Sequence, residues 1–322
     1  MKKDFIWASL LHLSDHLWDD EYTLPRGWYL PQNYTENIKV DVDVWDETVK
    51  FLAECKFNTV LIDVADGIQY EMHPEISAPN AWSKDFLKKK LDEIRALGMT
   101  PIPKLNFSAC HDTWLKKYRR MPSTPEYYAA CADTIREVCE VFDSPKLFHI
   151  GFDEEYELLQ RRYEMTTVRS QALWWHDFKL ICSECERWGA RPWVWSDAYW
   201  HNKETFVKNM SKSVLQSNWF YSNFNDYTEE ELQKMAIEFR AIQAYEDLDA
   251  LGYDQIPCCS AVYIQNNIHQ TLAFGKEKIS EEHLCGYMTA PWYLTTDEEK
   301  YRLKNDAYLF YLARKNNYPK TL

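Results

Sequence analysis

The chain has 322 residues, of which 46% are hydrophobic, and its formal net charge is −13. This length suffices for one large α/β barrel or two ordinary domains, and the hydrophobic content excludes a disordered chain. The acidic balance argues against nucleic acid and anionic membranes as partners, because both are bound by clustered Lys and Arg. The 14 Trp and 21 Tyr are more than a core needs, and their ring faces are suited to stacking on sugar rings.

The first apolar segment is predicted to be a strand rather than a signal peptide. Asp4, His12 and Asp15 interrupt it, and no small-residue cleavage site follows. No stretch of the sequence approaches the roughly 20 apolar residues of a membrane span. Nine cysteines without regular spacing are typical of a reducing compartment, so we expect a cytoplasmic protein. The pair Cys182 and Cys185 falls within a helical pattern and is expected to be two buried thiols, not a zinc site.

Strand-like and helix-like segments alternate along the chain, and several helices have clear start and stop signals. Ser83, Thr124 and Thr296 are predicted to begin helices, and Gly98 and Gly189 to follow helix ends. The predicted strands are 5–13, 59–64, 100–106, 147–152, 191–196, 214–219, 256–261 and 284–290. The predicted helices are 44–56, 83–97, 124–142, 165–188, 203–209, 228–251, 266–276 and 296–315.

This alternation predicts a single (β/α)8 TIM barrel over residues 1–322. Two doubly wound domains are the alternative, but no linker and no change of composition marks a boundary. Active sites of such barrels lie at the carboxyl ends of the strands. The residues that follow each strand are therefore the candidate site residues: Asp63, Asp66, Asn106, His111, Trp114, Asp153, Glu154, Glu155, Trp195, Asp197, Trp219, Tyr263 and Trp292.

Carboxylates surrounded by aromatic rings fit glycoside chemistry, in which an acid protonates the leaving oxygen and negative groups stabilise an oxocarbenium-like centre. Asp153 and Glu154 follow the fourth strand directly, and we expect both to reach the site. Glu155 or Glu157 is instead expected to begin the next helix, at the surface. The strand ends carry no glycine-rich phosphate loop and no metal-ligand spacing, so neither a cofactor nor a metal is predicted.

The segment HIGFDE (149–154) resembles the His-x-Gly-x-Asp-Glu motif of the family 20 glycoside hydrolases, the β-N-acetylhexosaminidases. The resemblance implies that Glu154 is the general acid and base. It also implies that Asp153 orients the 2-acetamido group of the substrate, whose carbonyl oxygen acts as the nucleophile. His149 lies within the strand and is expected to be a satisfied interior histidine.

Other strand ends are similar to the same family, in the same order. IPKLNFSACHDTW (102–114) is similar to its Ile-Pro-Glu-x-Asp-x-Pro-Gly-His segment, which implies that His111 lies near the catalytic Glu. VWSD (194–197), NWF (218–220) and APWYL (290–294) imply an aromatic box of Trp195, Trp219 and Trp292 around the sugar. IPCCSAVY (256–263) implies that the Tyr263 hydroxyl binds the acetamide. Asp197 and Asp63 are further candidates for binding an oligosaccharide or glycoconjugate substrate.

The sequence also departs from the family pattern. The first strand lacks the Arg that binds the outer hydroxyls of the sugar, and Arg26 comes only later. The acid of the eighth-strand Trp-x-Glu is replaced by Leu294, the third-strand Asp is Asn106, and Phe152 replaces a small residue. The amino-terminal α/β domain common in the family is not found in the sequence. We therefore expect altered recognition of the outer edge of the sugar.

Three functions remain open from the sequence. The first is a retaining, substrate-assisted hexosaminidase. In the second, Glu154 is the acid and Asp197 or Asp63 is the nucleophile or base on a glycoside without an acetamido group. The third is a catalytically inactive barrel that binds glycans.

Overall fold

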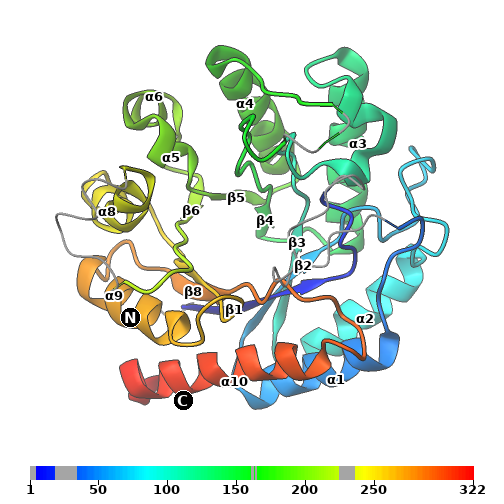
Figure 1. The fold of residues 1–322 in the computed structure, drawn as a ribbon. Helices are drawn as coiled ribbons and strands as arrows, with labels where there is room; N and C mark the ends of the chain where they lie inside the picture. The colour runs from blue at the N-terminus through cyan, green and yellow to red at the C-terminus, as the bar shows by residue number, and fades with distance from the viewer. Residues whose placement is uncertain (1–4, 19–34, 161–162, 164, 225–235) are drawn as a thin grey trace.

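The computed structural model describes residues 5–18, 35–160, 163, 165–224 and 236–322 (Figure 1). Its eight strands are parallel and form one sheet in the order β6-β5-β4-β3-β2-β1-β8-β7. The strands are β1 (Ile6–His12), β2 (Thr59–Asp63), β3 (Thr100–Lys104), β4 (Leu147–His149), β5 (Arg191–Trp195), β6 (Leu215–Ser217), β7 (Cys258–Cys259) and β8 (Gly286–Thr289).

The two ends of this sheet meet, which nearly closes it into a barrel. β1 pairs with both β2 and β8, so the first and last strands are neighbours. Isolated parallel bridges, Gln216 with Gln255 and Trp219 with Cys258, join the ends of the sheet at β6 and β7. The predicted (β/α)8 barrel is therefore confirmed.

Helices lie between the strands and surround the barrel (Figure 1). α1 at the start of the chain packs against α10 at its end, drawn in blue and red. The start of the predicted helix 228–251 lies outside the described residues. The helices are α1 (Val42–Glu54), α2 (Lys84–Ala96), α3 (Pro125–Val141), α4 (Gln171–Arg187), α5 (Ala198–His201), α6 (Lys203–Asn209), α8 (Ala236–Ala250), α9 (Asn267–Lys278) and α10 (Lys300–Asn317), with short 3-10 helices η1 (Thr113–Arg120) and η2 (Pro319–Thr321).

Most helix boundaries follow the predicted capping signals. Ser83 and Thr124 accept hydrogen bonds from the backbone N–H of Phe86 and Tyr127 and so cap α2 and α3. Gly98 and Gly189 follow α2 and α4 with a φ of 80°, the left-handed conformation that glycine adopts without strain. The start predicted at Thr296 is wrong, because α10 begins at Lys300 and Glu299 precedes it without a side-chain cap.

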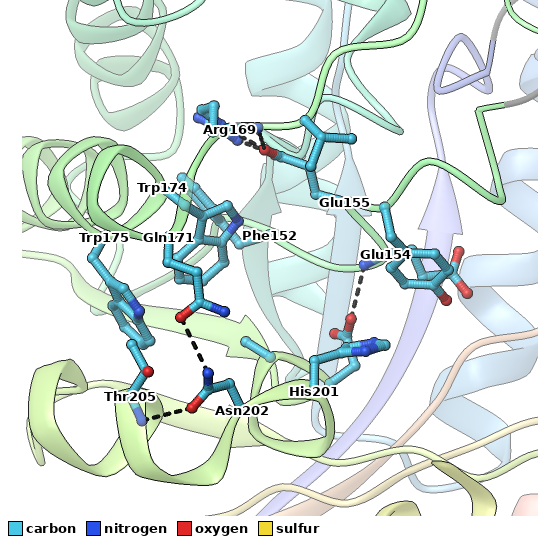
Figure 2. Close-up of a pocket in the computed structure, with 14 residues that line it drawn as sticks. Phe152, Glu154, Glu155, Arg169, Gln171, Trp174, Trp175, His201, Asn202 and Thr205 are labelled. Atoms are coloured by element: carbon cyan, nitrogen blue, oxygen red, sulfur yellow. Dashed lines mark hydrogen bonds and ion pairs between the residues drawn. The ribbon is translucent and has the colours of Figure 1, made fainter. Parts of the chain in front are cut away.

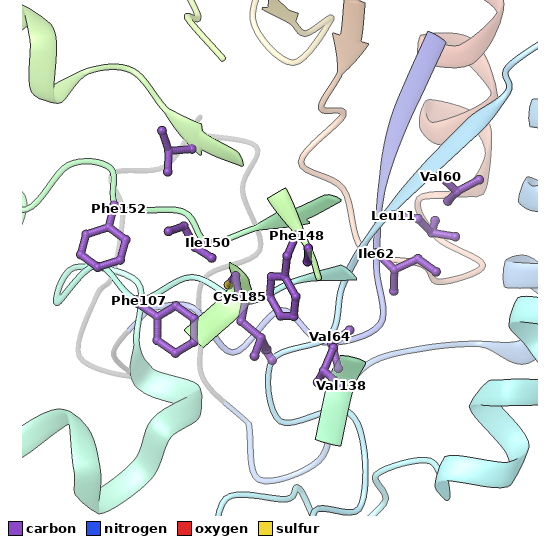
Figure 3. Packing of buried hydrophobic residues seen from close by; sticks show 14 of the residues in the cluster. Leu11, Val60, Ile62, Val64, Phe107, Val138, Phe148, Ile150, Phe152 and Cys185 are labelled. Atoms are coloured by element: carbon purple, nitrogen blue, oxygen red, sulfur yellow. The ribbon is translucent and has the colours of Figure 1, made fainter. Parts of the chain in front are cut away.

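Two apolar layers hold the barrel together, because successive residues of a strand face opposite sides of the sheet. Leu10 and Leu61 face the barrel interior, where they pack with residues such as Trp193 and Met288. Their neighbours on the other face, including Leu11, Val60 and Ile62, pack against the helices (Figure 3). All nine cysteines are free, and Cys182 and Cys185 are buried in α4 as predicted. Among the helices that the structure describes, none combines the length and apolarity needed to span a membrane.

Candidate active site

The chain turns sharply after β4, and this turn places the acidic residues. β4 ends at His149, three residues earlier than predicted, and Gly151, Phe152 and Glu154 have φ values of 70°, 66° and 58°. A Cβ on Gly151 would lie 2.0 Å from Asn106 Oδ1, so only glycine fits there. Asn106 Oδ1 accepts hydrogen bonds from the backbone N–H of Ser108 and Phe152, which ties the ends of β3 and β4 together.

Asp153, Glu154 and His111 form one compact group. His111 Nε2 lies 3.3 Å from Asp153 Oδ2 and 3.2 Å from Glu154 Oε2, and Asn106 Nδ2 donates to Asp153 Oδ1 at 2.8 Å. The Asp153 side chain is 10% exposed and that of Glu154 is 27% exposed. Asp153 is therefore fixed on both oxygens, whereas Glu154 remains accessible.

The charges within this group stabilise one another. Burial favours the neutral form of His111, but the charges of Asp153 and Glu154 and their hydrogen bonds raise its pKa to about 10. Burial likewise opposes ionisation of Asp153, but the charge and hydrogen bond of His111, followed by Asn106, lower its pKa to about 2. At neutral pH an imidazolium thus lies between an ionised, fixed carboxylate and an accessible one.

Asp197 contacts the backbone of Glu154, and its pKa is shifted in the opposite direction to that of Asp153. Its Oδ2 accepts a hydrogen bond of 2.8 Å from the backbone N–H of Glu154. Burial and then the nearby charge of Asp153 raise the pKa of Asp197 well above its usual range. Its Oδ1 is buried and has no hydrogen-bond partner.

A polar layer crosses the barrel beneath the mouth. His12, Asp63, Lys104 and His149 are paired in register across β1, β2, β3 and β4. Lys104 Nζ donates to Asp63 Oδ2, and His12 Nδ1 lies 3.6 Å from the same oxygen. Both side chains of the ion pair between Lys104 and Asp63 are fully buried. Asp63 Oδ1 and His149 Nε2 are buried without hydrogen-bond partners.

The three predicted indoles gather around one cluster at the strand ends. Trp195 belongs to the apolar cluster of the barrel interior, and Trp219 and Trp292 pack against that same cluster. The Trp195 and Trp292 ring centres are 5.9 Å apart. Tyr221, which sequence reasoning missed, stacks on Trp219 at 5.2 Å and joins the cluster. The sequence signal that could have identified Tyr221 is its position two residues after Trp219, just beyond β6.

Tyr263 is placed differently from the indoles. Half of its surface is exposed, and it lines a separate cavity with Tyr293, Tyr301 and Arg302 near the start of α10. The structure therefore does not bring Tyr263 into the cluster of Trp195, Trp219 and Trp292. Arg26 lies outside the described residues.

The expectation for Glu155 is wrong. Its side chain is 3% exposed and forms an ion pair with Arg169, and Glu155 Oε2 also accepts a hydrogen bond from the backbone N–H of Ala109. The next helix, α4, begins only at Gln171. Sequence reasoning missed Arg169, because no motif marks a buried arginine within a long loop.

Phe152 does not obstruct the acidic group. Its ring packs in edge-on contacts against Trp174 and Phe178 of α4, at 5.3 and 5.1 Å between ring centres. The left-handed backbone at Phe152 directs its side chain away from Asp153 and toward this helix. The larger residue is therefore accommodated by α4 and not by the mouth of the barrel.

One group among the described residues has the geometry to hold a metal ion. Ligand atoms of His111, Asp153 and Glu154 all lie within 4.8 Å of one another. A histidine that binds a metal must be neutral, whereas the two carboxylates raise the pKa of His111 to about 10 and so favour its protonated form. A metal ion bound here would have to displace the proton that the two carboxylates stabilise on His111.

Comparison with known proteins places this chain by its fold. No protein-family model and no curated protein sequence matches it. Among solved structures, an exo-β-N-acetylglucosaminidase of glycoside hydrolase family 20 from Vibrio harveyi, in complex with N-acetylglucosamine, matches 99% of this chain and 58% of its own. The TM-score is 0.62 and the identity is 12%.

Two further structures agree. A Flavobacterium johnsoniae chitobiase of the same family matches 96% of this chain and 48% of its own, with a TM-score of 0.59 and 18% identity. A mutant Streptomyces plicatus β-hexosaminidase in complex with N-acetylglucosamine matches 98% and 69%, with a TM-score of 0.62 and 11% identity. The chain thus spans about half to two thirds of the length of these proteins. The resemblance seen in the sequence motifs therefore extends to the fold of the family 20 barrels.

Proposed function

We propose that this protein is a retaining β-N-acetylhexosaminidase-like glycoside hydrolase that releases a terminal N-acetylhexosamine by substrate-assisted catalysis. One observation carries the proposal: His111 joins a fixed, ionised Asp153 to an accessible Glu154 at the end of β4. The fold shared with family 20 enzymes and the motif HIGFDE support it.

In the first step, Glu154 donates its proton to the glycosidic oxygen, and the bond between that oxygen and C1 breaks. The acetamido carbonyl oxygen of the substrate forms a bond to C1 in its place, which leaves positive charge on the acetamido group. Asp153, ionised and held by Asn106 and His111, stabilises this charge and its N–H. Water then attacks C1 while the bond between C1 and the acetamido oxygen breaks, and Glu154 takes up a proton from the water.

The aromatic cluster supplies the walls for the sugar in this proposal. Trp195, Trp219 and Trp292 present indoles around one end of the barrel, and the buried Trp195 Nε1 has no hydrogen-bond partner. Asp63 Oδ1 is also buried and unpartnered, so it can accept a hydrogen bond from a sugar hydroxyl. Asp63, fixed by Lys104, would thereby replace part of the recognition lost with the strand-1 Arg and the strand-8 Glu.

The geometry disfavours a mechanism with a second enzyme carboxylate. A nucleophile or general base must be ionised, whereas burial and the charge of Asp153 keep the pKa of Asp197 well above its usual range. Asp63 is held in an ion pair with the fully buried Lys104, which lowers its reactivity as a nucleophile. We therefore assign both residues to binding and positioning.

The test is hydrolysis of aryl N-acetyl-β-glucosaminide and N-acetyl-β-galactosaminide beside the plain aryl β-glucoside. We expect turnover of at least one acetamido substrate and none of the plain glycoside. Glu154→Gln is the control, because any activity that survives it comes from elsewhere. Turnover of the plain glycoside alone would overturn the substrate-assisted mechanism, and turnover of none would favour the glycan-binding barrel.

A further inference from the structure

A cavity opens at the rim of the barrel, between the loops that follow β7 and β8 and the start of α10. Its volume is about 350 Å³, within the range of about 300–1,000 Å³ for small-molecule sites. Both loops leave the carboxyl ends of their strands, which is the end of the barrel that carries Glu154. This Tyr263 cavity is named after one of the polar and aromatic residues that line it: Tyr263, Gln265, Tyr293, Tyr301, Arg302 and Asn305.

The Tyr263 cavity is distinct from the acidic site. Figure 2 shows the hollow beside Glu154, which is bounded by the loop after β4 and by helices α4, α5 and α6. Among the described residues, none lines both cavities. Trp292 packs against the barrel-interior cluster that contains Trp195 and also against the apolar cluster that contains Tyr293. The Tyr263 cavity is therefore connected to the predicted aromatic box through Trp292 without being part of it.

The walls of the Tyr263 cavity are held in place by the fold. Asp306 of α10 is buried, and its two oxygens accept hydrogen bonds from the backbone N–H of Ala261 at 3.0 Å and from Thr289 Oγ1 at 2.6 Å. This side chain ties the loop after β7 to α10 and to β8. Trp292 has a left-handed φ of 58°, which turns the chain between the Trp292 and Tyr293 side chains. A ligand that binds between fixed walls loses less affinity to the ordering of the protein.

Three tyrosine rings supply apolar surface to the cavity. Tyr293 is buried in the apolar cluster beneath it, whereas Tyr263 is 50% exposed and Tyr301, in the first turn of α10, is 73% exposed. Single exposed rings are common on proteins, but rings that gather at one cavity mark an interaction site. Because Tyr301 is so exposed, the cavity is open to the side, and a ligand can extend beyond it.

The polar groups of the cavity are neutral overall. Gln265 and Asn305 contribute amides, which both donate and accept hydrogen bonds. Arg302 Nη1 lies 3.3 and 3.1 Å from the two carboxylate oxygens of Glu299, and the guanidinium lies 5.4 Å from the centre of the Tyr293 ring. No other charged side chain among the described residues lines the cavity. An anion would compete with Glu299 and a cation would be repelled by Arg302, so the lining favours a neutral ligand.

A neutral sugar matches this combination of groups. The C–H faces of a pyranose pack against aromatic rings, and its hydroxyls need partners that donate and accept. We propose that the Tyr263 cavity is a second, non-catalytic carbohydrate site that binds a neutral sugar residue within a longer glycan chain. The site goes beyond the proposed function and does not require Glu154 to be a proton donor. It holds the protein on a glycan and so raises the local concentration of chain ends at the barrel mouth.

The test is native gel electrophoresis of the full chain in gels that contain glycol chitin, a soluble and neutral β-linked polymer. We expect the polymer to retard the wild type, and Tyr263→Ala and Tyr301→Ala each to raise the Kd about three- to tenfold through the loss of one aromatic contact. Tyr301→Phe keeps the ring and should be retarded as the wild type is. Tyr308→Ala is the matched control, because Tyr308 is 49% exposed on the same helix and does not line the cavity.

The outcomes separate this site from the proposed function. No retardation of the wild type, or equal retardation of the wild type and both alanine variants, would overturn the site. Stronger retardation by carboxymethyl chitin, an anionic form of the same polymer, would overturn the neutral class of ligand. Retardation that depends on Tyr301 in a protein that hydrolyses no aryl N-acetylhexosaminide would leave the site standing and overturn the proposed function. Thermal unfolding of each variant establishes that it is folded.

Discussion

Glu154 and Glu155 are neighbours in the chain, yet the fold gives them opposite surroundings. The Glu154 side chain is 27% exposed and contacts His111, and the same imidazole also contacts the Asp153 carboxylate. The Glu155 side chain is 3% exposed and is enclosed by Arg169 and two backbone N–H groups. One carboxylate is open to a ligand, and the other is fully engaged by the protein.

The backbone accounts for this difference. Gly151, Phe152 and Glu154 have left-handed φ values, which turn the chain repeatedly over four residues, so successive side chains leave in different directions. Asp153 and Glu154 face the barrel mouth, Phe152 packs on α4, and Glu155 reaches the loop that leads to α4. Non-glycine residues adopt this conformation at a cost of about 1–3 kcal/mol each, a cost that is common at functional sites. The ion pairs on both sides of the turn hold it in place.

The largest expected effect is on activity and comes from Glu154→Gln. Removing the proton donor should lower kcat by about 10²- to 10⁴-fold, because general acid catalysis contributes on that order. The midpoint of denaturant unfolding should change little, because the side chain is accessible and, among the described residues, its hydrogen-bond partner is His111. Steady-state kinetics on an N-acetylhexosaminide, together with urea unfolding, measure both quantities. A fall in stability that matches the loss of activity would mean that Glu154 is structural.

Glu155→Gln should show the opposite pattern. It leaves the buried Arg169 with an incomplete set of partners, and breaking a buried ion pair costs about 3–5 kcal/mol. We expect the midpoint of urea unfolding to fall markedly, whereas Glu157→Gln, at an exposed position two residues on, should leave it within experimental error. An unfolding midpoint equal to that of the wild type would contradict a stabilising role of the buried ion pair between Glu155 and Arg169.

The same contrast shows what the sequence could predict. The spacing of apolar residues and the helix-capping residues located every strand and most helices, because both depend on neighbouring residues and on which face of an element is buried. The motif also identified Asp153, Glu154 and His111, which the structure brings together. Glu155 was misjudged because its partner, Arg169, is 14 residues away, in a segment that was predicted to be part of helix 165–188 but precedes α4.

Strand ends were the other weak point of the prediction. β4 was expected to run to Phe152, since the apolar letters continue, but the strand ends at His149. Backbone hydrogen bonds to the neighbouring strands continue through Ile150 and Gly151, and the left-handed backbone at Gly151 and Phe152 then turns the chain. Tyr263 was expected at the site from the resemblance of IPCCSAVY (256–263) to the family segment, and the half-exposed position it occupies depends on how the loop after β7 packs near α10. Such loop geometry follows from long-range contacts that one sequence does not reveal.

The smallest expected effect is a pH dependence of stability that arises from the pair of His111 and Asp153. The pKa of His111 is raised from 6.5 to about 10 in the folded state, so its contribution is complete below pH 6.5 and is lost as pH rises through 10. The pKa of Asp153 is lowered from 3.8 to about 2, so its contribution is present above pH 3.8 and is lost as pH falls through 2. The pair therefore stabilises the fold fully between about pH 4 and pH 6.5.

His111→Gln removes this pair and should lower the free energy of unfolding by about 1.5–3 kcal/mol within that window, the usual range for hydrogen bonds to charged groups. The deficit should shrink as the pH rises from 6.5 to 10, because the wild type then loses the same charge. Urea unfolding at a series of pH values measures it, with His269→Gln at an exposed position of α9 as the control. A deficit that stays constant across this range would mean that His111 is neutral in the folded protein. Asp153 would then lack the cation that keeps it ionised in the proposed mechanism.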